Sequence, residues 1–203
     1  MTEVIPHNRN RLGVWISRAT HPLIIFIPTL IIVLKNTPLL EALGWISFIA
    51  LLIFVPATIL LRRLKQQGKQ TYQREARHLI YVTFWVCMVM STLLALVLGA
   101  PSRLLFSLLC LCIWVPLQYA VNARFTKISV HVAVISGIML ALLLMGELSS
   151  IPWLIGAIGV VLATAWARLV TGHHSLLQVS LGITVSTISV LLAFGLLALF
   201  HLF

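Results

Sequence analysis

The residues of this chain that are capable of chemistry gather in short polar clusters, and one cluster combines an arginine, a histidine and a glutamine. Arg168, His174 and Gln178 are spaced six and four residues apart. Gly172 can end one helix, so that the next begins near His174 and places its imidazole in an electropositive first turn. Residues four apart share a helix face, so the Gln178 amide oxygen can accept a hydrogen bond from one ring nitrogen. The other nitrogen is then free to act as a nucleophile.

The adjacent His173 and His174 raise the alternative of a metal site. Neighbouring residues of a helix point about 100° apart, and no Asp or Cys stands nearby to complete a set of ligands. We therefore expect neither a metal nor any other cofactor at this cluster.

A second cluster stands at the start of an apolar run. Arg124, Lys127 and His131 occupy positions i, i+3 and i+7, so in a helix they form one polar stripe, with Ser129 beside it. A single histidine would more often be a hydrogen-bonded core residue, but ionisable groups at membrane depth are costly and are functional by default. The stripe therefore predicts a functional site at the start of this span.

The third cluster contains Arg74 and Arg77, which share a helix face if a helix begins this early. Two guanidinium groups on one face can fork onto the oxygens of a phosphate. The alternative is that they only anchor the following span on the cytoplasmic side of a membrane.

The elements that must position these clusters are membrane helices. The chain has 203 residues, of which 61% are hydrophobic and 9% charged, and it has no aspartate. Its mean hydropathy of +1.09 excludes a water-soluble domain. The formal net charge is +10, but long apolar runs separate the cations. This pattern argues against nucleic acid and favours lipid head groups or phosphate as partners.

The apolar runs predict an all-α polytopic transmembrane bundle with six to seven spans. We expect residues 1–19 to form a polar basic segment and residues 20–203 a single membrane-embedded domain. The first run contains Pro22 and Pro28, so it can be interfacial or tilted. Residues 99–103 are expected to form a tight turn, or else a kink. The predicted helices are 20–36, 43–61, 79–99, 103–121, 128–147, 151–168 and 176–201.

Loop charge predicts the orientation, because Lys and Arg are retained on the cytoplasmic side. With seven spans and a cytoplasmic amino terminus, Lys35, Arg103 and Glu147 fall on the outer side, and the three polar clusters fall on the cytoplasmic side. The cations assigned to the cytoplasmic side are Arg9, Arg11, Arg18, Arg62, Arg63, Lys65, Lys69, Arg74, Arg77, Arg124, Lys127 and Arg168.

In their order and spacing, the clusters resemble the type 2 phosphatidic acid phosphatase superfamily, membrane enzymes that hydrolyse lipid phosphates and diphosphates without metal. The third motif of that family is Ser-Arg, five residues, His, three residues and Asp. Here Arg168, His174 and Gln178 keep this spacing, with Ala167 in place of Ser and Gln178 in place of Asp.

The other motifs of the family are matched less fully. The second motif, Pro-Ser-Gly-His, corresponds to Ile-Ser-Val-His at residues 128–131, which keeps Ser129 and His131. The basic first motif does not occur as such, and Arg74 and Arg77 are its proposed stand-ins. The resemblance covers about residues 70–190 and implies a phosphatase-like core there.

The resemblance also implies a mechanism. His174 would attack phosphorus to form a phosphohistidine, His131 would protonate the leaving alkoxide, and Gln178 would orient His174. The residues that would bind the phosphate are Arg168, Arg74, Arg77, Lys127, Arg124 and Ser129.

The replacement of Asp by Gln178 keeps three functions open. Glutamine can orient His174, but it contributes no negative charge to stabilise the imidazolium that forms during attack. The first function is an integral membrane phosphatase acting on a lipid phosphate or an isoprenyl diphosphate. The second is an inactive relative that binds or transports anionic lipid, and the third is a structural subunit in which the clusters only anchor spans.

Overall fold

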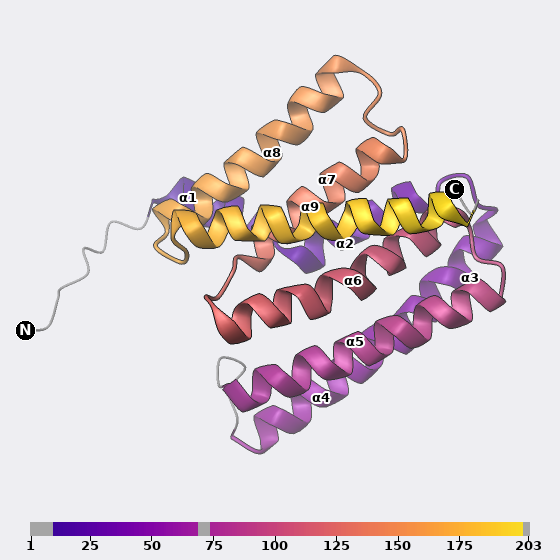
Figure 1. The fold of residues 1–203 in the computed structure, drawn as a ribbon, viewed down its shortest axis with the longest axis horizontal. Coiled ribbons are helices and arrows are strands. Elements are labelled where there is room, and N and C mark those ends of the chain that lie inside the picture. Colours follow the sequence, from indigo (N-terminus) through magenta and orange to yellow (C-terminus); the bar gives the residue numbers. More distant parts are fainter. Residues whose placement is uncertain (1–9, 69–73, 201–203) are drawn as a thin grey trace, which may run out of the picture.

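The computed structural model describes residues 10–68 and 74–200, and for residues 74–77 it describes the backbone alone. Every secondary-structure element in this part of the chain is a helix, so the predicted all-α class is confirmed (Figure 1). The elements are α1 (Arg11–Ala19), α2 (Pro22–Val33), α3 (Leu39–Ile49), the π-helical turn η1 (Ala50–Phe54), α4 (Val55–Gln66), α5 (Arg74–Val97), α6 (Ser102–Arg124), α7 (Val130–Leu144), α8 (Ile151–Val170) and α9 (Leu176–Leu199).

The described part of the chain has the helices of a polytopic membrane protein. Five are long and apolar enough to cross a bilayer, and the number is six if α1 and α2, which are bent by 43° at their junction, form one span. Helix α7 has 15 residues, which gives about 22 Å of length, less than the roughly 30 Å of hydrocarbon. This helix corresponds to the predicted span 128–147, which was one of the seven. Large apolar side chains such as Leu40, Val97 and Ile151 are exposed on the surface of the bundle, which suits a lipid environment.

The second predicted run, 43–61, continues through Pro56 as expected and extends by a few residues at each end. Pro56 has no backbone N–H, and a proline ring clashes with the carbonyl four residues back. The chain accommodates it with the turn η1, in which the Val55 N–H donates to the Ala50 carbonyl, five residues earlier. The helix is therefore continuous from Leu39 to Gln66.

The first nineteen residues were expected to be a polar segment outside the membrane domain, and part of them forms helix α1, which packs against α8. The contact depends on Gly13, since a Cβ at this position would lie 2.8 Å from Val170 Cγ2 and 3.7 Å from the Ala167 carbonyl oxygen. The start of the chain is thus held beside the end of α8. Residues 99–103 form the expected turn, with Gly99 at φ +70°.

Helix α9 lies at the centre of the bundle, against α6, α7 and α8 (Figure 1). Small residues bring it close to its neighbours. A Cβ at Gly182 would lie 3.0 Å from the Ser129 carbonyl oxygen, and one at Gly137 would lie 3.3 Å from Ser186 Cβ. Close approach of this kind is typical of helix pairs that pack in membranes. It fixes the start of α7 against the first turns of α9.

Glu147 closes the opposite end of the bundle. Its carboxylate accepts hydrogen bonds from Lys35 and Arg103, which follow α2 and begin α6. These bonds, the one from Lys35 above all, hold the pKa of the Glu147 carboxyl below its usual range. The three residues that the sequence assigned to the outer side therefore meet in one ion-pair network.

Candidate anion site

The polar end of the bundle is built from three parts of the chain. Residues 171–175 connect the end of α8 to the start of α9, and residues 125–129 connect the end of α6 to the start of α7. The α1–α2 junction packs beside these two connections. Gly172, at φ +69°, lets α8 end and the chain turn back, and the His174 N–H then donates to the Arg168 carbonyl at 3.3 Å. Two of the predicted site residues are thus joined through the backbone.

The side chain of Gln178 fixes the orientation of the His174 imidazole. Gln178 Nε2 donates to Thr126 Oγ1 at 3.1 Å, and the Ser175 N–H donates to Gln178 Oε1 at 3.3 Å. The amide oxygen therefore faces the ring, 2.9 Å from His174 Nδ1. Since an amide oxygen only accepts, Nδ1 must carry the proton, and Nε2 of a neutral His174 keeps its lone pair.

The surroundings of His174 favour its neutral form. Burial is the largest cause of a lowered pKa for this imidazole, and the charges of Arg168, Lys127 and His173 lower it further, while the hydrogen bond to Gln178 raises it. The net pKa lies below the ordinary 6.5. A neutral imidazole with a free Nε2 is the form that a nucleophile needs.

Arg168 is a buried cation at the end of α8, only 9% exposed. Its Nη1 donates to Ser17 Oγ of α1 at 2.8 Å, while its Nε is buried without a hydrogen-bond partner. Among the described carboxylates, Glu41 accepts from Trp45 and Glu147 lies at the other end of the bundle. A buried guanidinium without an anion beside it is costly, so the site favours an anionic ligand.

His131 lies at the start of α7 in the same group of charges. Arg168, His174, His173 and His21 are all close enough to act electrostatically on its imidazole. The ring of His21 meets that of His131 edge to face, with centroids 5.2 Å apart. His21 caps α2 by accepting the Leu23 N–H at Nδ1, at 3.3 Å, so in its neutral form the proton is on Nε2.

The segment that carries Ser129 and Lys127 is held from both sides. The Ile128 N–H donates to Asn122 Oδ1 at 2.9 Å, and Asn122 in turn donates to the Tyr81 hydroxyl at 2.7 Å. On the other side, the Ser129 N–H donates to the Gln178 carbonyl at 3.2 Å. The Ser129 hydroxyl is fully buried and has no partner. This second orphaned polar atom lies between His131 and the first turn of α9.

The structure brings together six of the predicted site residues, namely His131, His174, Gln178, Arg168, Lys127 and Ser129. Arg124 is exposed at the end of α6 and has no described contact with this group. The side chains of Arg74 and Arg77 lie outside the described part of the chain, although α5 begins at Arg74. Among the described residues, no three His, Cys, Asp or Glu side chains group in the way that a metal ion needs.

Sequence reasoning missed three residues of the site: His21, Ser17 and Thr126. The only local signal was the His-Pro pair at residues 21–22, which is typical of a helix start with proline in the first turn. Nothing in the spacing of His21 or Ser17 indicated contact with residues more than a hundred positions later. That proximity follows from the packing of α1 on α8 and of α2 on α7.

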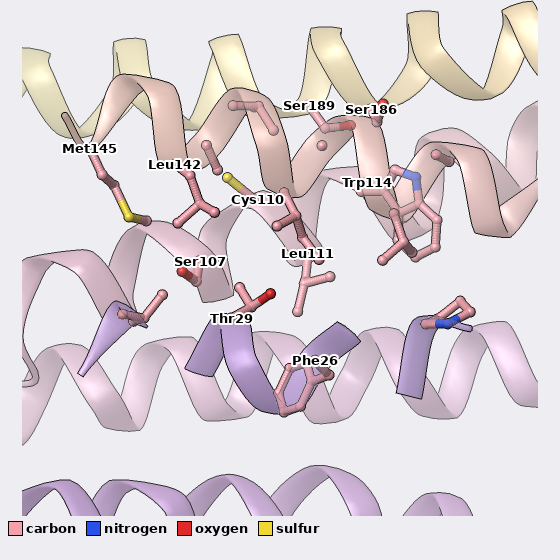
Figure 2. A pocket seen from close by; sticks show the side chains of 18 residues that line it. Phe26, Thr29, Ser107, Cys110, Leu111, Trp114, Leu142, Met145, Ser186 and Ser189 are labelled. Atoms are coloured by element: carbon pink, nitrogen blue, oxygen red, sulfur yellow. The ribbon is translucent and has the colours of Figure 1, made fainter. Parts of the chain in front are cut away.

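An apolar groove opens beside the polar end, between α2, α6, α7 and α9 (Figure 2). It has a volume of about 120 Å³ and its lining is almost entirely apolar. Pro22, which follows His21, and Ala133, two residues after His131, line it near the polar residues, and Met145 lines it at the other end of α7. The groove therefore extends along α7, from the neighbours of His21 and His131 in the sequence to Met145.

Comparisons of the chain with protein-family models, with curated proteins and with solved structures give no match. The function therefore has to be argued from the chemistry of these residues.

Proposed function

We propose that the protein is a metal-independent membrane phosphatase that hydrolyses a lipid phosphate or an isoprenyl diphosphate through a phosphohistidine on His174. The observation that carries this proposal is the buried Arg168, which has no described carboxylate beside it and whose Nε has no partner among the described residues, next to two imidazoles and the orphaned Ser129 hydroxyl. Phosphoryl transfer mainly requires donors and positive charge around the transferring group, and these groups supply both.

The first step is the attack of His174 Nε2 on phosphorus. As the N–P bond forms, the P–O bond to the lipid breaks and its electron pair stays on the leaving oxygen. His131, in its protonated form, gives that oxygen a proton, and the lipid alcohol leaves, or the prenyl monophosphate where the substrate is a diphosphate. The negative charge of a bound phosphate is what favours a protonated His131. Arg168, Lys127 and Ser129 are the groups that stabilise charge on the phosphoryl oxygens.

The second step returns the enzyme to its starting state. Water attacks the phosphohistidine while the now neutral His131 takes its proton, and the N–P bond breaks with its electron pair returning to His174 Nε2. Inorganic phosphate leaves, and His131 is protonated for the next cycle. The hydrogen bond from His174 Nδ1 to Gln178 keeps Nε2 directed at phosphorus throughout.

The groove supports a substrate that is a lipid. A head group at the histidines would have its hydrocarbon chain beside Pro22 and Ala133, in an apolar channel that the bilayer can reach. The cations give the orientation that we propose, because α4, α6 and α8 end on the same side of the bundle (Figure 1) and carry Arg63, Arg124 and Arg168 there. Lys and Arg are retained on the cytoplasmic side, so the site would face the cytoplasm.

The experiment that tests the function is a phosphate-release screen with the purified protein in detergent. Phosphatidate, lysophosphatidate and prenyl mono- and diphosphates are each supplied with and without EDTA. We expect release of inorganic phosphate from at least one of them at the same rate in both conditions. Release that requires an added metal, or no release from any of these lipids, would contradict the proposal.

The pH dependence should reflect the lowered pKa of His174. Its neutral form is the nucleophile, so the acidic limb of the kcat/KM profile should appear where the pH falls through this pKa, below 6.5. Because the charge of Lys127 contributes to the lowering, Lys127→Met should move the acidic limb towards higher pH. Ionisation of the substrate is common to both proteins, so the comparison isolates the enzyme. An acidic limb that does not move between the two proteins would contradict the assignment of His174.

A second function, binding or transport of anionic lipid without turnover, is favoured by one specific observation. Gln178 is neutral, and none of the described carboxylates lies at the site to support an imidazolium at His174. This function predicts that the protein binds phosphatidate in mixed micelles but releases no phosphate from it, which the same screen decides.

A further inference from the structure

We propose that the indole N–H of Trp114 donates a hydrogen bond to a carbonyl group of the bound lipid, and so makes the groove selective for chains joined to the head group by an ester or amide. The inference rests on the proposed function, since it names the class of lipid that the site accepts. It would make Trp114 a specificity-determining residue that lies outside the reacting groups.

Trp114 Nε1 differs from the other polar groups that line the groove. It is buried and has no hydrogen-bond partner. The hydroxyls of the lining residues all donate to carbonyls of their own helices: Thr29 to Ile25 at 2.8 Å, Ser107 to Arg103 at 2.9 Å, Ser186 to Ile183 at 2.9 Å and Ser189 to Val185 at 2.7 Å. In this lining, Trp114 is the donor left for a ligand.

An unpaired indole N–H in such a place calls for a physical reason. A buried donor without a partner is destabilising, and in the interior of a bilayer no bulk water reaches it. A buried tryptophan N–H usually has a hydrogen-bond partner. A tryptophan in this apolar lining is therefore favourable when the ligand accepts a hydrogen bond from its N–H. A hydrocarbon chain alone has no acceptor.

The position of Trp114 fits the upper part of a lipid chain. Figure 2 shows Trp114 and Ser186 at the end of the groove that lies away from Met145. Met145 follows the last residue of α7, whereas His131 is near its first, so Trp114 lies on the side of the histidines. Ester and amide carbonyls occur at the top of a lipid chain, next to the head group. A polyprenyl chain has only carbon there and leaves the N–H unpaired.

The test compares lipids that differ in this carbonyl alone. The purified protein is given dioleoyl phosphatidate and its dioleyl ether analogue, which has the same head group and chains, and both initial rates and equilibrium binding in mixed micelles are measured. The wild type should prefer the ester about five- to tenfold, the size of one neutral hydrogen bond. In Trp114→Phe the ratio should fall to about one, with the ether lipid affected less than about twofold.

Trp85→Phe is the matched control, because Trp85 is a half-exposed tryptophan whose Nε1 already donates to the Cys112 carbonyl at 3.0 Å. It should keep the preference for the ester. Equal use of the two lipids by the wild type, or a preference that survives in Trp114→Phe, would overturn the inference. If neither lipid releases phosphate and the prenyl phosphates of the screen release none either, the proposed function fails, and the ratio of the two binding constants still decides the role of Trp114.

Discussion

Replacement of His174 by alanine should reduce phosphate release from the lipid substrate by about 10³-fold or more, because it removes the atom that forms the covalent intermediate. Two observations support the proposed role of His174: its Nδ1 is held by Gln178 at 2.9 Å, and burial lowers the pKa of the imidazole, which favours a neutral Nε2. The measurement is inorganic phosphate released per enzyme, with the amount of folded protein checked by gel filtration in detergent.

His173→Ala is the informative comparison, because the two histidines are adjacent and differ in their surroundings. His173 is exposed, and its Nδ1 lies 2.7 Å from Thr171 Oγ1, which directs the ring to its own turn. We expect His173→Ala to keep most of the activity. An acid-labile phosphoenzyme should form in the wild type and in His173→Ala, and be absent from His174→Ala. A phosphoenzyme that persists without His174 would assign the attack to another residue.

Replacement of His131 by alanine should reduce the rate of hydrolysis of the lipid substrate by about 10²- to 10³-fold, a usual contribution of a positioned general acid. The physical reason is that a lipid alkoxide is a poor leaving group until it is protonated. With p-nitrophenyl phosphate, whose leaving group needs no proton, the first step should be nearly normal. Attack by water still lacks its base, so the variant should show a burst of nitrophenol and accumulate phosphorylated His174.

The burst separates a role in proton transfer from a role in folding. A misfolded protein would lose its activity towards both substrates equally and would form no phosphoenzyme. Stopped-flow measurement of nitrophenol at several enzyme concentrations gives the burst amplitude, which should equal the amount of active sites. Equal losses with both substrates and no burst, in a variant that elutes as the wild type does, would contradict the role of His131.

The amino-terminal helices α1 and α2 contact two residues of the candidate site. Ser17 of α1 accepts from the buried Arg168, and His21 at the start of α2 packs edge to face on His131. These contacts hold in place a cation and an imidazole that both face the phosphate in the proposed function, and preorganised charge is the main means by which a protein catalyses phosphoryl transfer.

Composition and local spacing determined the class of this molecule. A 203-residue chain cannot bury all the side chains of a 61% apolar sequence in its interior, so its helices require a lipid bilayer around them. The apolar runs indicated the approximate positions of these helices. Spacing also determined the pair that lies within one turn, because residues four apart on a helix share a face whatever the fold. The contact between His174 and Gln178 is of this kind.

Local rules were less reliable where a backbone effect competed with composition. The helix predicted over 43–61 does run through Pro56, but the π-helical turn that accommodates this proline was not predicted. The polar residues after Asn10 form a helix, because Gly13 lets α1 lie against α8. Neither the turn nor the contact can be predicted from hydropathy, which contains no information on backbone hydrogen bonds or on neighbours distant in the sequence.

Only the tertiary structure decided which distant residues share the site. His131, Arg168 and His174 lie on different elements, and they meet because small residues of α7 and α9, such as Gly137 and Gly182, let the helices approach closely. Helix packing depends on the shapes of surfaces formed by residues far apart in the chain. For that reason the histidines and the guanidinium could be identified in the sequence as candidate site residues. Their proximity to one another, the contact of His21 with His131 and the groove beside Trp114 became visible only in the folded molecule.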